Sequence, residues 1–154
     1  MNPSLKTLGR WKILGFVAAV LLVAGAWPVR YLASPRWEVW VVNDEGQPVT
    51  QVDVRLVYKN YSAEGESHEV TLTTDQDGHV VFPQRYERAC IFQRVIYSMS
   101  SAIAGVHASF GRHAYLLVAG SGYEGSALEG NYLVDWRGSP DSMQSRIVAK
   151  HVRM

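Results

Sequence analysis

The stretch WEVWVVNDEGQPVTQVDVRLVYKN, residues 37–60, decides the fold class. Residues 37–42 are rich in β-branched and aromatic side chains, which fit the pleated surface of a strand. The cluster NDEGQP, residues 43–48, contains the Gly and Pro of a turn. Beyond it, Val52, Val54, Leu56 and Tyr58 alternate with mostly polar neighbours. That period of two predicts a second strand with one buried face.

The same signals return along the rest of the chain. Val70 and Leu72 alternate with polar residues and predict a third strand, and residues 79–82 predict a short fourth strand that ends at Pro83. Three more strands are expected at residues 112–120, 132–136 and 145–153. About seven strands with frequent turns predict a mainly β, Ig-like sandwich that comprises residues 37–154.

The segment TTDQDGHVVFP, residues 73–83, allows two interpretations. Asp75, Asp77 and Gly78 resemble the start of a calcium loop, but an EF-hand needs a bidentate Glu at the twelfth position, which is Tyr86 here. As a turn, Asp75 accepts backbone N–H groups and Gly78 adopts a positive φ. The sequence therefore favours a turn and predicts no metal site.

The pattern changes at residues 85–104, where Phe92, Val95, Met99 and Ile103 recur at intervals of three and four. Gly105 follows as a stop signal. This spacing predicts one inserted amphipathic helix, with an apolar stripe packed on a sheet or over one end of the sandwich. Because the segment is rich in β-branched and aromatic residues, two strands are the alternative.

The N-terminal region predicts export. Residues 1–12 form a basic flank expected in the cytoplasm, residues 13–29 carry no charge, and residues 30–36 read as a linker. The apolar run is either a transmembrane signal anchor or a cleaved signal peptide, and a buried core helix is a third alternative. The positive-inside rule places residues 37–154 outside the cytoplasm, in the periplasm or the extracellular space.

Charge and cysteine content exclude some classes. The net charge is +1, but without Lys6, Arg10 and Lys12 the 15 basic residues fall to 12 against 14 acidic ones. A weakly acidic body gives no reason to expect nucleic-acid binding. Cys90 is the only cysteine, so no internal disulfide forms, and we expect its thiol to be a small core residue rather than a bond to another chain.

Two blocks of sequence, residues 37–83 and 112–124, resemble the carboxypeptidase regulatory-like domains, which are transthyretin-like (prealbumin-like) β-sandwiches. The resemblance rests on the acidic turn with Gly46 and Pro48, on a Thr-Asp-x-x-Gly turn at residues 74–78, and on the pair Gly122-Tyr123. It implies the sandwich fold and a turn role for Asp75. The helical stretch between the blocks departs from the family pattern.

Candidate chemistry is sparse. No zinc-binding histidine pair, nucleophile elbow or phosphate loop appears, so we expect no enzyme activity and no cofactor. Tyr123, Tyr132 and Trp136 lie near predicted strand ends and are the candidate binding residues, since aromatic rings stack on sugars or anchor proteins. The sequence thus predicts a membrane-anchored binding or structural module of the cell envelope. Its alternatives are an accessory subunit of an envelope assembly, with a protein partner, and a glycan-binding module.

Overall fold

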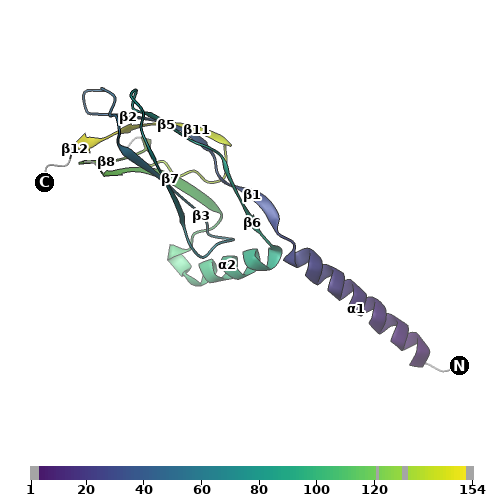
Figure 1. The fold of residues 1–154 in the computed structure, drawn as a ribbon. Coiled ribbons are helices and arrows are strands. Elements are labelled where there is room, and N and C mark those ends of the chain that lie inside the picture. Colours follow the sequence, from purple (N-terminus) through teal and green to yellow (C-terminus); the bar gives the residue numbers. More distant parts are fainter. Residues whose placement is uncertain (1–3, 121, 130–131, 152–154) are drawn as a thin grey trace.

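The computed structural model describes residues 4–120, 122–129 and 132–151, and this part of the chain is mainly β with two α-helices. Helix α1 (Ser4–Ala26) projects from one end of the β-domain (Figure 1). Its segment Gly9–Ala26 has a mean hydropathy of 1.6 and is long and apolar enough to cross a membrane. Only 6% of that segment is buried, so α1 is not a core helix.

Two sheets face each other in the β-domain. The three-stranded sheet has the order β11-β2-β5, from β11 (Ser142–Val148), β2 (Arg36–Val42) and β5 (His79–Phe82), with β11 parallel to β2. The five-stranded sheet has the order β12-β8-β7-β3-β4, from β12 (Lys150–His151), β8 (Tyr123–Ser126), β7 (Arg112–Gly120), β3 (Asp53–Asn60) and β4 (His68–Thr73). A small antiparallel pair joins β9 (Leu128–Glu129) to β10 (Tyr132–Leu133). The mainly β class is confirmed, but the count of seven strands is not, because the described residues contain more.

The core lies between the two sheets and follows from the alternation of the strands. Trp37, Phe82 and Ile147 of one sheet and Leu56 and Leu116 of the other are all 0% exposed. The indole Nε1 of Trp37 donates a hydrogen bond to Ser145 Oγ at 2.9 Å, so its one polar group is satisfied. The alternation predicted around Leu56 is therefore correct, and it defines the inner face of β3.

A two-stranded ribbon connects α1 to the sandwich. Strand β1 (Val29–Ser34) pairs with β6 (Arg85–Ala89), and the ladder resumes where Trp37 of β2 pairs with Phe82 of β5. Pro35 and Pro83 lie in the gap between the two ladders, since a proline has no N–H to donate. Residues 30–36, which the sequence had suggested to be a linker, thus contain most of β1 and, after Pro35, the first residue of β2.

Helix α2 (Ile91–Ile103) is shorter than predicted, because residues 85–89 belong to β6. Cys90 is its N-cap, and its Sγ accepts the backbone N–H of Gln93 at 3.4 Å. The thiol is only half-buried, so the expectation of a core cysteine is wrong. A 3₁₀ turn, η1 (Gly105–His107), follows the helix.

The apolar stripe of α2 does not pack on the sandwich, contrary to the prediction. Phe92, Val95, Met99 and Ile103 are 42%, 50%, 64% and 84% exposed, and no residue of α2 is buried. The polar side of the helix contacts the domain instead. The apolar periodicity therefore predicted the existence of the helix correctly, but the prediction that its apolar stripe packs on the sandwich is wrong.

The segment at residues 73–83 is a turn. Asp75 Oδ1 accepts the backbone N–H groups of Asp77 and His79, both at 2.9 Å. These bonds lower the pKa of Asp75, with the His79 N–H as the largest cause. Gly78 has φ of +67°, and a Cβ there would lie 2.6 Å from Val41 O. Backbone donors occupy the carboxylate, as the turn interpretation requires.

Candidate binding site

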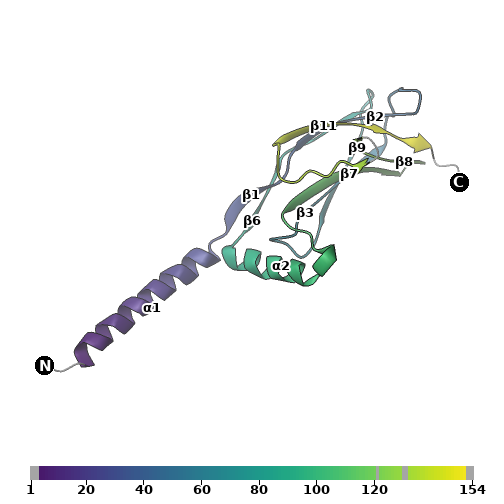
Figure 2. The same cartoon turned by 180° about the vertical axis from the view of Figure 1, so that it is seen from behind.

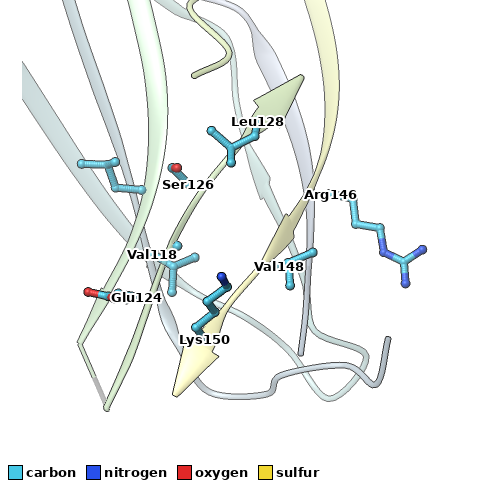
Figure 3. A pocket seen from close by; sticks show the side chains of 9 residues that line it. Val118, Glu124, Ser126, Leu128, Arg146, Val148 and Lys150 are labelled. Carbon is cyan, nitrogen blue, oxygen red and sulfur yellow. The ribbon is translucent and has the colours of Figure 1, made fainter. Parts of the chain in front are cut away.

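The main concave surface lies at the end of the sandwich far from α1, where strands β8 and β11 approach each other (Figures 1 and 3). The cleft has a volume of about 720 Å³. Its lining comes from β7, β8, β9, β11 and β12 and consists of Leu117, Val118, Glu124, Gly125, Ser126, Leu128, Arg146, Val148 and Lys150.

The course of the last strand creates this cleft. After β11, the backbone N–H of Ala149 donates to Val42 O at 2.7 Å, and the chain then crosses to the other sheet as β12. There Lys150 pairs with Glu124 of β8. At the crossing, a Cβ on Gly125 would lie 2.9 Å from Val148 O, so only glycine permits this approach without a shift.

The cleft combines apolar side chains with charges. Leu128 and Val148 are 53% and 46% exposed, and together they offer an apolar surface without a covering side chain. Lys150 points between Glu124 and Val148, whereas the guanidinium of Arg146 points away from the other labelled side chains (Figure 3). Such a surface can bind an extended segment with an apolar side chain beside an acidic group.

The three aromatic residues predicted to bind do not form one platform. Trp136 is 2% exposed, and its Nε1 donates to Pro140 O at 2.6 Å, so its ring contacts core atoms and has no free face. Tyr123 is half-buried and lies edge-on to His151, with ring centroids 5.2 Å apart. Its neighbour Glu124 lines the cleft. The backbone of Tyr132, in β10, pairs with that of Glu129 in β9, but the side chain of Tyr132 lies outside the described part of the structure.

His113, at the opposite end of β7 from the cleft, has a structural role. His113 Nδ1 lies 2.9 Å from Asp135 Oδ2, and His113 Nε2 lies 3.1 Å from Phe110 O. Both ring nitrogens are therefore engaged within the domain. Arg137 Nε also donates to Asp135 at 3.1 Å. Over the described residues, no group of three or more His, Cys, Asp or Glu side chains is arranged to hold a metal ion.

Sequence reasoning missed the cleft residues of β11 and β12. Ile147 and Ala149 are buried, whereas Arg146, Val148 and Lys150 alternate with them and are exposed. The alternation of Val148 with Arg146 and Lys150 in the sequence could have indicated a strand face that carries both an apolar side chain and charges. The partner strand β8 was unpredictable, because its pairing depends on the crossing at Ala149.

Comparison with known proteins gives little further information. No family model and no curated protein sequence matches the chain. Among solved structures, the chain is similar to 3-chlorocatechol 1,2-dioxygenase from Rhodococcus opacus 1CP, with a TM-score of 0.42 and 17% identity over 78% of this chain and 61% of that chain. At that score the likeness carries no inference about fold or chemistry.

Proposed function

We propose that this chain is an exported, membrane-anchored β-sandwich module of the cell envelope that acts by binding a protein partner, as an accessory subunit of an assembly. The resemblance to transthyretin-like domains belongs to this proposal and concerns its fold. The periplasm or the extracellular space is its proposed compartment.

The observation that carries the proposal is the direct connection between α1 and the sandwich. Only Trp27 and Pro28 separate the end of α1 from the start of β1, and the ribbon of β1 and β6 leads on into the core strands β2 and β5. A cleaved signal peptide has a small-residue cleavage site at the end of its apolar run, and Ala24-Gly25-Ala26 is the candidate here. The bulky Trp27 and then Pro28 follow Ala26 directly, which disfavours cleavage at this site and favours an anchor that stays attached.

A protein partner is favoured over a glycan by the surfaces at hand. Glycan binding was expected from exposed coplanar aromatic rings, and the burial of Trp136 removes one of the three candidates. The cleft instead offers the exposed Leu128 and Val148 with Lys150 and Glu124 beside them, which suits a peptide segment with an apolar side chain and charged or polar neighbours. It also lies at the end of the domain away from α1, where an anchored protein is accessible to partners (Figure 1).

Topology and processing test the anchor. A reporter fused after Met154 is expected to be active only outside the cytoplasm, and the full-length chain is expected in the membrane fraction after alkaline washing. A reporter active only in the cytoplasm contradicts export. A shortened chain that is released from membranes contradicts the anchor.

Site-directed photo-crosslinking tests the cleft. A photoreactive residue at Val148 or Leu128 is expected to capture a partner in intact cells, since both side chains are exposed in the cleft. The matched control is Thr71, which is exposed on the edge strand β4 outside the cleft lining. Equal crosslinking at Thr71 and Val148, or none at Val148, contradicts a partner in the cleft.

A further inference from the structure

Helix α2 presents its faces in the reverse of the usual arrangement. Its half-buried residues are Arg94, Tyr97, Ser98 and Ser101, which follow one another at intervals of three, one and three and so share one side of the helix. The opposite side carries only apolar residues, and all of them are exposed. This apolar face consists of Ile91, Phe92, Val95, Ile96, Met99, Ala102 and Ile103.

Specific contacts fix this orientation. Ser101 Oγ donates to Tyr61 O at 3.0 Å, and the Arg94 guanidinium lies 5.2 Å from the ring centroid of Tyr31. The ring of Tyr97 lies against Gly65, where a Cβ would approach its Cε1 to 3.3 Å. These contacts join α2 to β1 and to the loop between β3 and β4. A rotation that buried the apolar face would break all of them.

Glu64 reinforces the support beneath the helix. It accepts a hydrogen bond from the Tyr31 hydroxyl, and its Oε2 lies 2.7 Å from His68 Nε2. Burial, and then the hydrogen bond that Tyr31 donates to Glu64, raise the pKa of Tyr31, so this phenol keeps donating to Glu64 well above neutral pH. The ring that faces Arg94 is therefore held in place.

The apolar face of α2 is continuous with the end of α1. The Phe92 ring touches Gly25, where a Cβ would lie 2.7 Å from Phe92 Cζ. Trp27, two residues further on, is 68% exposed, and tryptophan is typical of the membrane–water boundary. Both views place α2 at the end of the sandwich nearest α1 (Figures 1 and 2). The apolar face thus begins at the level where an α1 span would leave the hydrocarbon.

We propose that α2 is an interfacial membrane helix, whose apolar face lies in the outer leaflet of the same bilayer that α1 crosses. The proposal rests on the anchoring proposed above. The 13 residues of α2 extend about 20 Å along the helix axis. Interfacial helices bury an apolar face about 5–10 Å deep at the boundary between headgroups and acyl chains. The occupant is lipid, because a lipid surface is already required where Phe92 meets Gly25.

The charge of α2 indicates which lipids it accepts. Arg94 is the only charged residue of the helix, and it is turned toward Tyr31 rather than toward the apolar face. Attraction to anionic headgroups therefore contributes little, and burial of apolar area drives the insertion. We expect the contact with lipid in uncharged phosphatidylcholine vesicles and at high salt concentration alike.

The test uses the full chain in phosphatidylcholine vesicles with one environment-sensitive fluorophore on a single cysteine. Cys90→Ser provides the background, because serine retains an N-cap acceptor. Met99→Cys places the probe at the centre of the apolar face. Gln93→Cys is the matched control, since it is also exposed on α2 but lies outside that face, and Glu45→Cys reports the far end of the domain. Near-UV circular dichroism verifies that each variant is folded.

We expect the probe at residue 99 to shift to the blue and to be quenched by lipids brominated in the upper acyl chain, several-fold more than at residue 93. The probe at residue 45 should show no quenching. Equal quenching at residues 99 and 93 overturns the proposal. A blue shift at residue 99 without lipid quenching also overturns it, because a second copy or another protein then covers the face.

Flotation of the unlabelled chain with the vesicles tests the anchor separately. A chain that fails to float contradicts the anchoring, whereas one that floats without quenching at residue 99 contradicts only the role of α2.

Discussion

Strand β3 and helix α2 carry equally clear amphipathic patterns, yet they use them in opposite directions. In β3, Val54, Leu56 and Tyr58 point inward and are 0%, 0% and 4% exposed. In α2, Met99 and Ile103 point outward, while Arg94 and Ser101 contact the domain. A periodic apolar pattern reports that one face meets apolar surroundings. It does not report whether those surroundings are protein or lipid.

The sharpest way to separate the two regions is the same substitution in each. Phe82→Ala in β5 removes a ring that is 0% exposed, and we expect it to lower the free energy of unfolding by about 3–5 kcal/mol. Chemical unfolding of the full chain in detergent micelles, followed by near-UV circular dichroism, measures the loss. A loss below about 1 kcal/mol would mean that β5 does not belong to the core.

The turn after β4 should give the next largest effect. Gly78→Ala forces a Cβ onto a residue at φ +67° and toward Val41 O, and we expect a cost of about 1–3 kcal/mol. Gly46→Ala is the matched control, because Gly46 has φ +80° but its Cβ would meet only the flexible end of Arg146, at 3.4 Å. Equal melting temperatures for the two variants would show that the contact with Val41 is not decisive.

The charge of Asp75 should have a smaller, pH-dependent effect. The folded state lowers its pKa from 3.8, so its carboxylate adds stability above that pH and loses it as the pH falls through the lowered value. Asp75→Asn should therefore melt below the wild type at pH 7, and the gap should narrow under acid conditions. Added calcium should leave both melting temperatures unchanged. A gap that widens on acidification contradicts the assignment.

The smallest effect is expected on α2. Phe92→Ala acts on a ring that is 42% exposed and contacts Gly25 rather than the core, so the sandwich should lose less than about 1 kcal/mol of unfolding free energy. The unfolding assay used for Phe82→Ala measures it under the same conditions. A loss as large as that of Phe82→Ala would show that α2 packs as a soluble helix and would erase the contrast between the two regions.

Local features of the fold were predictable from the sequence. The alternation around Leu56, the turn at Asp75 and the existence of a helix near Met99 all depend on neighbours within a few residues. Each left a periodic or turn signal, and each is present in the structure.

Long-range features were not predictable. Residues 85–89, RYERA, were assigned to the helix because they show no apolar alternation, whereas pairing with β1 makes them a strand. The orientation of α2 depends on Tyr61 and Tyr31, which are distant in sequence. The cleft depends on the crossing of the last strand beside Gly125. Among the candidate binding residues, Trp136 was placed near a strand end, but its side chain is 2% exposed and its indole N–H is satisfied by Pro140 O.

The gap at Pro35 and Pro83 has a mechanical consequence. Because neither proline can donate to the ladder, the backbone pairing is interrupted where the ribbon joins the sandwich. Helix α2 contacts both sides of this junction, since Arg94 lies over Tyr31 of β1 and Ser101 donates to Tyr61 O in the loop after β3. It acts as a strut. If α2 lies in the bilayer as we propose, thinning or bending of the bilayer that displaced α2 would tilt the sandwich and change the direction in which the distal cleft faces.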